Sequence, residues 1–258
     1  MQDRGPAAYV AEFIGTLALV FFVTMAVSLF VLVPVEPAQP GVAPVEPFVD
    51  WSVIGLVHVF VLFMLIQTLA LVSGAHFNPA VTVAMTALRQ IKPPDAAIYI
   101  LAQLAGAVAA ALLTKLLLNE FSNAEAINFG ATLVQEGGRL GDKTLLGLLC
   151  EAIGTFFFVW AIVGVAVNPR GAREWAALVI GGTLGLGVMV MGPLTGGSFN
   201  PARSFGPALV SGEFGGAGEF LLIYVLGPAL GALLAALAYF NLVMQPGKKG
   251  EEGMEPVG

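Results

Sequence analysis

The stretch SGAHFNPAV runs from Ser73 to Val81, and a related stretch, TGGSFNPARS, runs from Thr195 to Ser204. Both stretches place Asn-Pro-Ala directly after a glycine-containing turn, inside long apolar regions. Proline favours the first position of a helix, and asparagine favours the cap position before it. Each Asn-Pro-Ala therefore predicts the start of a helix, capped by Asn78 in the first stretch and by Asn200 in the second.

The helices predicted there are too short to cross a membrane. The apolar pieces run over Pro79–Leu88 and Pro201–Val210. Each holds about ten residues, or ~15 Å of helix, which is half of a ~30 Å hydrocarbon core. We expect two half-helices that enter the membrane and stop near its middle.

The composition indicates a membrane protein. Of the 258 residues, 57% are hydrophobic and 11% are charged, whereas soluble domains carry charge on about a quarter of their residues. The segments long and apolar enough to span the bilayer are Ala7–Val33, Trp51–Val72, Asp95–Leu118, Thr144–Val167, Trp175–Pro193 and Glu219–Val243. The net charge of -6 comes mostly from ends and loops, so no nucleic-acid partner is expected.

The remaining segments are predicted to be loops and a tail. Pro34–Asp50 is rich in proline and should form an exposed loop, and Asn119–Lys143 is a longer polar loop. Residues 244–258 have the composition of a flexible tail. The single cysteine, Cys150, cannot form an intramolecular disulfide, and no metal-binding spacing is present, so neither a metal nor a cofactor is expected.

The two halves of the chain repeat each other. AEFIGT at 11–16 recurs as CEAIGT at 150–155, and AQLAGA at 102–107 recurs as GPALGA at 227–232. The halves, about 7–118 and 144–243, each hold three spans and one half-helix, and an odd number of spans turns the second half upside down. The predicted fold is an all-α membrane protein: six transmembrane helices plus two re-entrant half-helices in an inverted 3+3 repeat. It forms a single channel domain over 1–258, with a site near the midplane.

Lysine and arginine predict the orientation in the membrane. The side with both termini carries Arg4, Arg89, Lys92, Arg170, Arg173, Lys248 and Lys249. The opposite side carries Lys115, Arg139 and Lys143. Positively charged loops stay in the cytoplasm, so both termini should be cytoplasmic. The expected location is the plasma (inner) membrane.

The inverted arrangement makes two half-helix N-termini meet at the midplane. Each N-terminus carries roughly half a positive charge, so the pair repels cations, hydronium included. The side-chain oxygens of Asn78 and Asn200 can cap their own half-helices, which leaves the NH₂ groups free to orient a passing water. Backbone carbonyls of the preceding turns can line a wet pore, and those expected to do so belong to Gly74, Ala75, His76, Gly196, Gly197 and Ser198.

These residues resemble those of the aquaporins, also called major intrinsic proteins. The likeness covers about Ala11 to Tyr239 and rests on two Asn-Pro-Ala motifs inside an inverted repeat, the second continuing as NPARS. The motif residues are Asn78, Pro79, Ala80, Asn200, Pro201 and Ala202. In aquaporin-type pores an arginine and the half-helix dipoles exclude protons and cations. The resemblance also implies a homotetramer with one pore in each subunit.

The resemblance maps a four-residue selectivity filter onto this chain at His58, Val188, Gly197 and Arg203. Only the arginine matches the strict water channels. The four residues are similar to those of certain plant vacuolar-membrane aquaporins. That resemblance implies conduction of water together with small neutral solutes such as ammonia. The motif of the glycerol facilitators is similar to NPARD, with an aspartate after the arginine, whereas here Ser204 follows the arginine.

The resemblance also implies that Glu12 and Glu151, at matching places in the two halves, bond to the backbone of the half-helix loops. Membrane carboxylates also form proton relays, which is the alternative interpretation of both residues.

The predicted function is a passive channel in the lipid bilayer that conducts water, with ammonia or other small neutral solutes as further permeants, and excludes protons and ions. The alternatives are a broader facilitator of the glycerol or urea type, an ion-coupled transporter and a structural membrane protein. A transporter should carry an ion-coupling acid at the midplane, where the chain offers Asn78 and Asn200 without one. The two histidines are far apart in sequence and no nucleophile motif occurs, so an enzyme is not expected.

Overall fold

A computed structural model describes residues 5–32, 48–121, 124–125, 127–134, 140 and 144–245. The described residues contain six helical runs long and apolar enough to cross a membrane, which confirms the predicted number. Their main helices are α1 (Pro6–Leu29), α2 (Trp51–Ser73), α4 (Pro93–Leu118), α6 (Thr144–Ile162), α7 (Ala176–Thr195) and α10 (Gly227–Tyr239). Short helical segments extend three of them. They are the wider helical turns η2 (Val163–Val167), η4 (Leu221–Leu226) and η5 (Phe240–Met244), the tighter turn η3 (Arg173–Trp175) and the short α-helix α9 (Ala217–Phe220).

The two half-helices begin at the Asn-Pro-Ala motifs, as predicted. They are α3 (Pro79–Ala87) and α8 (Pro201–Ser211). The side chain of Asn78 accepts a hydrogen bond from the backbone of Ala80, and that of Asn200 accepts from Ala202 and Arg203. α8 ends at Gly212, whose φ of 83° is the left-handed conformation that glycine adopts at little cost.

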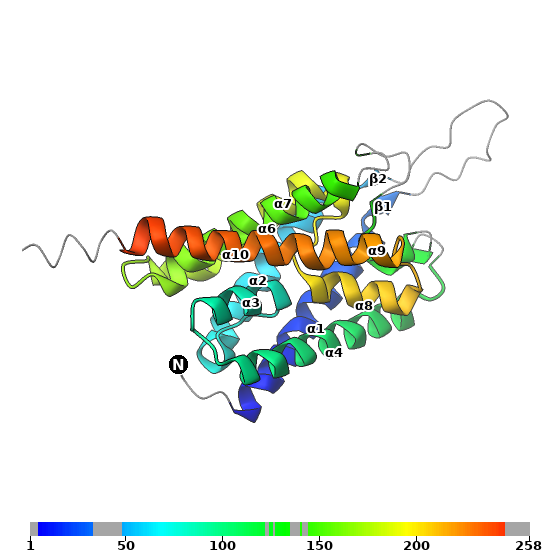
Figure 1. Ribbon diagram of the computed structural model, residues 1–258. Helices are drawn as coiled ribbons and strands as arrows, with labels where there is room; N and C mark the ends of the chain where they lie inside the picture. The colour runs from blue at the N-terminus through cyan, green and yellow to red at the C-terminus, as the bar shows by residue number, and fades with distance from the viewer. Residues whose placement is uncertain are drawn as a thin grey trace, which may run out of the picture.

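The spanning helices form a bundle that the half-helices complete. The main helix–helix contacts run in the order α4, α1, α2, α7, α6 and α10. At the remaining edge, α8 packs on α4 and α3 packs on α10. Figure 1 shows α3 and α8 between α4 and α10, with their starts facing each other. Each half therefore closes the bundle through a helix of the other half.

Glycines allow the closest helix crossings in both halves. A Cβ added at Gly106 of α4 would overlap the carbonyl oxygen of Phe13 on α1. A Cβ added at Gly231 of α10 would overlap the carbonyl oxygen of Ala152 on α6. Small residues at such crossings let membrane helices approach backbone to backbone.

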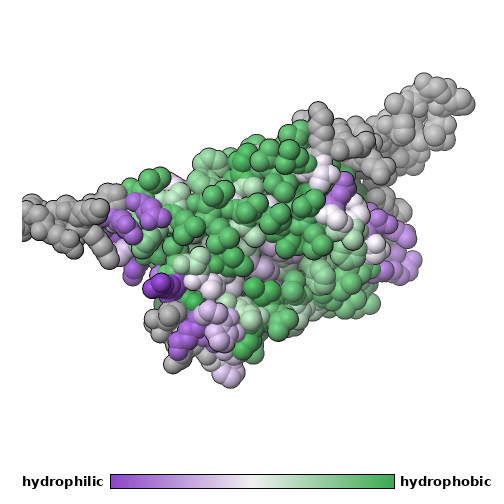
Figure 2. Space-filling model, viewed as in Figure 1, coloured by the Kyte–Doolittle hydropathy of each residue, from purple (hydrophilic) through white to green (hydrophobic). Residues whose placement is uncertain are grey.

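The outer surface is apolar along the length of the helices. Leu71, Leu101 and Leu116 are among the most exposed large side chains. Figure 2 shows an apolar belt over the helices, with polar residues gathered toward both ends. Such a belt is stable in contact with lipid hydrocarbon and not with water.

Several predicted boundaries were wrong by a few residues. The first span ends at Leu29 instead of Val33, because residues 31–32 form a strand, β1 (Val31–Leu32), that pairs antiparallel with β2 (Phe48–Val49). The end of the predicted loop 34–50 is thus structured, and Asp50 caps α2. The end of the fifth span also differs, at Thr195 instead of Pro193. Residues 33–47 and 246–258, which include most of that loop and of the predicted tail, lie outside the described residues.

Candidate functional site

Two matching turns lead into the half-helices. Left-handed φ angles occur in the first turn at Gly74 (90°), Ala75 (53°) and Phe77 (48°), and in the second at Gly196 (80°), Gly197 (54°) and Phe199 (52°). Residues other than glycine adopt this conformation at a cost of roughly 1–2 kcal/mol each, so the surrounding structure must hold both turns in place.

Glu12 on α1 holds the first turn. Its Oε1 accepts hydrogen bonds from Ser73 Oγ at 2.6 Å and from the backbone N–H of His76 at 3.0 Å. Its Oε2 accepts from the backbone N–H of Phe77 and from Gln103 Nε2, both at 2.7 Å. The carboxyl group is fully buried, and four donors surround it.

Glu151 on α6 holds the second turn in the same way. Its Oε1 accepts from Thr195 Oγ1 at 2.6 Å and from the backbone N–H of Ser198 at 3.0 Å. Its Oε2 accepts from the backbone N–H of Phe199 at 2.7 Å. The repeat position that corresponds to Gln103 holds Pro228, so the second half has no amide there.

A phenylalanine ring anchors each turn in a gap left by a glycine. Phe77 and Phe199 are fully buried. A Cβ added at Gly15 would overlap the ring of Phe77, and one added at Gly154 would overlap the ring of Phe199. These two glycines, in the repeated AEFIGT and CEAIGT segments, make room for the rings.

The two caps bond to each other's turns. Asn78 Nδ2 donates to the carbonyl oxygen of Phe199 at 2.8 Å, and Asn200 Nδ2 donates to that of Phe77 at 2.9 Å. The expectation that each NH₂ is wholly free was therefore wrong, because one N–H of each joins the two half-helices. An asparagine amide has two N–H groups, so one on each side chain remains for another acceptor.

A narrow central cavity lies where the two halves meet. Its lining residues are Leu19, His58, Leu62, His76, Asn78, Phe158, Leu184, Ser198, Asn200 and Arg203. The volume open to the centres of water-sized spheres is about 10 Å³, which is close to one water position. Both asparagine caps face this cavity, so a molecule inside it can meet both half-helix starts.

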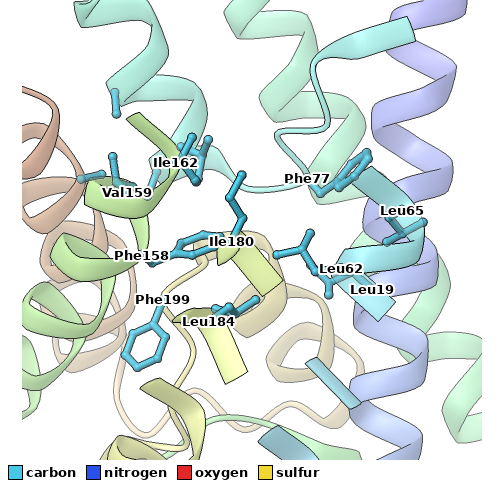
Figure 3. Close-up of a cluster of buried hydrophobic side chains, with 14 of the residues drawn as sticks. Leu19, Leu62, Leu65, Phe77, Phe158, Val159, Ile162, Ile180, Leu184 and Phe199 are labelled. Carbon is cyan, nitrogen blue, oxygen red and sulfur yellow. The ribbon is translucent and has the colours of Figure 1, made fainter. Parts of the chain in front are cut away.

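The apolar wall of the cavity was not anticipated from the sequence. Leu19, Leu62, Phe158 and Leu184 come from four spanning helices, α1, α2, α6 and α7. Figure 3 shows Leu62 and Phe158 converging with Ile180 from separate helices. In the sequence these positions are indistinguishable from the many other apolar residues of the spans.

Arg203 brings a buried cation to the cavity. The side chain is 2% exposed, and its Nη1 donates to the carbonyl oxygen of Gly130 at 2.8 Å. Its Nε has no hydrogen-bond partner within the described part of the chain. A guanidinium carries five N–H donors, so the bond to Gly130 leaves donors of Arg203 for a molecule in the cavity.

His58 offers an acceptor on another wall. Its Nδ1 lies 2.9 Å from the carbonyl oxygen of Ile54 in the preceding helical turn. Since a carbonyl oxygen can only accept, this contact assigns the proton to Nδ1 and leaves Nε2 as an acceptor in the neutral ring.

The predicted filter residues fall into two pairs. His58 and Arg203 both line the central cavity. Val188 and Gly197 lie against each other, since a Cβ added at Gly197 would be 3.2 Å from Val188 Cα, but neither is among the lining residues of that cavity. Val188 is completely buried.

Three residues near the site, Gly130, Thr132 and Gln103, were not predicted from the sequence. Gly130 and Thr132 lie in the long polar loop, where no motif marks them. Gln103 carried a usable signal, because a polar side chain inside a spanning helix is rare and often functional. Among the described residues, no group of three or more His, Cys, Asp or Glu side chains is placed to bind a metal ion.

Comparison with known proteins gives a consistent result. The family profile described as Major intrinsic protein matches residues 5–239. Aquaporin AqpM of Methanothermobacter thermautotrophicus is 35% identical over 243 residues, which cover 92% of this chain and 97% of that protein. Glycerol uptake facilitator protein-like 6 of Lactiplantibacillus plantarum is 37% identical over 228 residues, covering 88% and 94%.

A solved structure supports the fold. The X-ray structure of the aquaglyceroporin from Plasmodium falciparum matches with a TM-score of 0.76 at 21% identity, covering 94% of this chain and 98% of that one. With the family profile spanning nearly all described helices, the chain belongs to the major intrinsic protein family, which consists of membrane channels and not of enzymes.

Proposed function

We propose that this channel conducts water and ammonia in single file and excludes glycerol, ions and protons, with His58, Val188, Gly197 and Arg203 as its selectivity filter. The observation that carries the proposal is the narrowness of the central cavity, which has room for about one water position. A water molecule fits such a space, whereas glycerol, with six non-hydrogen atoms, needs a wider one.

Exclusion of cations follows from the half-helices and from Arg203. The N-termini of α3 and α8 both point at the cavity, and each contributes roughly half a positive charge. The guanidinium of Arg203 adds a full charge to the cavity wall. Within a narrow apolar passage, these charges raise the energy of a cation far more than they would in water.

Protons are excluded by the orientation of water at the caps. The remaining N–H groups of Asn78 and Asn200 donate to the oxygen of a water between them. That water then points its own hydrogens away from the caps on both sides. A chain of waters reversed at this point cannot pass a proton along its full length.

Ammonia is proposed as a second permeant because His58 supplies an acceptor beside Arg203. Nε2 of the neutral ring can accept an N–H of ammonia, and the arginine N–H groups can donate to its nitrogen. Gly197 adds no side chain to the filter and packs with its backbone against Val188.

A broader glycerol facilitator is the second candidate. The observation that favours it is the similarity to the protein named Glycerol uptake facilitator protein-like 6. Two features favour the water channel instead. The central cavity is narrow, and Ser204 stands at the position where glycerol facilitators typically have an aspartate.

Stopped-flow light scattering of proteoliposomes tests these functions side by side. Water flux is measured with an impermeant osmolyte, solute flux with glycerol and urea, and ammonia flux with an enclosed pH dye. We expect fast water flux with a low activation energy, ammonia flux above that of empty liposomes, and no glycerol flux. Glycerol flux equal to water flux would support the second candidate, and absence of water flux would contradict both.

A filter variant refines the same assay. His58→Phe replaces the acceptor ring by a larger apolar one. We expect ammonia flux to fall to the level of empty liposomes while some water flux remains. Unchanged ammonia flux in this variant would contradict the role of His58.

We also propose that the protein is a homotetramer in the plasma membrane with both termini in the cytoplasm. The start of α1 and the end of η5 lie at the same end of the bundle (Figure 1). The connections that carry Arg89, Lys92, Arg170 and Arg173 belong to this end by the order of the spans. Cysteine labelling of the Arg170–Arg173 connection in intact cells tests the orientation, and multi-angle light scattering of the purified channel tests the tetramer.

A further inference from the structure

The segment 127–134, which connects α4 to α6, reaches the filter end of the pore. Its backbone is unusual, since Asn128 (φ 53°), Phe129 (φ 51°) and Gly130 (φ 79°) are left-handed in succession. Two of the three are not glycine, and a non-glycine residue in this conformation is held there by its surroundings. The turn is therefore not the relaxed conformation of a free loop.

This turn presents the Gly130 carbonyl to Arg203. Phe129 is 7% exposed, and Lys115 Nζ of α4 lies 5.6 Å from the centre of its ring. Gly130 sits against the backbone of Thr24 on α1. The carbonyl oxygen that accepts from Arg203 thus belongs to a packed turn, whose position along the pore sets the position of the guanidinium.

A chain of buried hydroxyl groups ties the same segment to α8. Thr132 Oγ1 donates to Ser204 Oγ at 2.6 Å, and Ser204 Oγ donates to Ser198 Oγ at 2.6 Å. Ser198 Oγ in turn donates to the carbonyl oxygen of Asn200 at 2.8 Å. Thr132, Ser198 and Ser204 are each no more than 2% exposed, so no bulk water replaces these bonds.

The hydroxyl chain and the hydrogen bond of Arg203 connect the same two segments of the protein. Arg203 and Ser204 are adjacent on α8, and their partners, Gly130 and Thr132, are two residues apart. Each hydroxyl in the chain has one hydrogen to donate and uses it toward the next group, so the chain runs in one direction to the Asn200 cap. Removing one hydroxyl leaves a buried donor or acceptor without its partner.

We infer that Thr132 and Ser204 are positioning residues that fix the Arg203 guanidinium in the pore and thereby set the size limit for solutes. This inference rests on the proposed function of Arg203 as a filter residue. When the tie between Thr132 and Ser204 is lost, the left-handed turn relaxes, the Gly130 carbonyl moves, and the guanidinium follows it away from the opposite wall. Water still passes, and larger neutral solutes begin to pass.

The test compares four variants in proteoliposomes. Thr132→Val keeps the side-chain shape and removes the hydroxyl, and Ser204→Ala removes the other member of the pair. Thr132→Ser restores a hydroxyl. Thr86→Val is the matched control, because it keeps the side-chain shape and removes a hydroxyl that donates to the carbonyl oxygen of Thr82 at 2.7 Å on the other half-helix, α3.

The measured quantity is the ratio of urea permeability to water permeability. We expect Thr132→Val and Ser204→Ala to raise this ratio about fivefold or more, a change on the scale of one lost hydrogen bond, while Thr132→Ser and Thr86→Val keep the wild-type ratio. A wild-type ratio in both Thr132→Val and Ser204→Ala, with water flux intact, would overturn the inference and leave the channel function standing. An equal increase in Thr86→Val would also overturn the inference, since general loosening of the bundle would then explain the change.

Discussion

Asn78 Nδ2 donates to the backbone carbonyl oxygen of Phe199, 2.8 Å away and 121 residues later in the chain. The reciprocal bond, from Asn200 to Phe77, is 2.9 Å long. Each asparagine therefore caps its own half-helix and holds the turn of the other. These two bonds join the halves near the middle of the membrane, where the backbone of both turns is irregular. They satisfy carbonyl oxygens that no helix partner and no lipid could satisfy.

Asn200→Asp tests the electrostatic part of this arrangement. The aspartate keeps an oxygen for the cap but loses the amide that donates to Phe77, and it places a negative charge at the cavity. Two unit charges ~4 Å apart interact by ~1 kcal/mol in water and by ~4 kcal/mol near a protein surface. The aspartate charge therefore lowers the energy of a cation at the caps, and the proton leak should rise about tenfold or more. Pyranine-loaded proteoliposomes under a potassium diffusion potential measure the leak.

The control is Asn241→Asp, because Asn241 is exposed and donates to the carbonyl of Leu237 in its own helix. It should leave the leak unchanged. Normal water flux with an unchanged proton leak in Asn200→Asp would show that the charge of this cap does not govern exclusion.

Glu151→Gln tests the support of the second turn. An amide in place of the carboxylate turns one acceptor oxygen into a donor, which then faces the backbone N–H of either Ser198 or Phe199. Each buried group left unsatisfied costs about 1–3 kcal/mol, so Tm in detergent should fall by roughly 2–10 °C. Circular dichroism measures Tm, and the exposed Glu174→Gln serves as control. Equal Tm values for the two variants would refute the supporting role.

The architecture was largely predictable from the sequence, because it depends on patterns that one chain displays. Long apolar runs give the spans, and Asn-Pro gives a helix cap followed by a helix start at both half-helices. The repeat of AEFIGT as CEAIGT gives the inversion, once each half is seen to hold an odd number of spans. These features are local or periodic, and they need no knowledge of the contacts.

The finer geometry of the site was not predictable, because it depends on contacts between distant segments. Gly130 meets Arg203 only after the long loop folds back over the bundle. Gln103 on α4 meets Glu12 on the neighbouring helix α1, 91 residues earlier in the chain. The strand of residues 31–32 forms only when its partner at 48–49 is beside it, and no propensity marks so short a pair.

Gly154→Ala tests the gap that receives the Phe199 ring. The added methyl group overlaps the ring, which must move together with the carbonyl that accepts from Asn78. Overpacking of this kind costs typically 1–3 kcal/mol, so both Tm and water flux should fall.

Gly182→Ala on α7 is the matched control, because nothing lies within 4 Å of the added methyl group. Alanine favours a helix over glycine by about 1 kcal/mol at most, so Tm should stay the same or rise. Similar losses of Tm in both variants would contradict the specific packing of Phe199.

Mercury sensitivity tests the placement of Gly197 in the filter. Cys150, the single cysteine, lies on α6 and is not among the residues that line the central cavity. Water flux of the natural channel should therefore resist mercuric chloride. Gly197→Cys should become sensitive, with flux restored by a thiol reductant.

The Gly197 variants need a control for backbone strain. An added Cβ lies 3.2 Å from Gly192 N and from Val188 Cα, so the neighbouring backbone must shift by a few tenths of an ångström. Gly197→Ala carries this strain without the thiol and should conduct water whether or not mercury is present. If Gly197→Cys conducts and mercury leaves it unaffected, residue 197 does not face the pore. If mercury blocks the natural channel and Cys150→Ser removes the block, Cys150 and not Gly197 lies next to the water path.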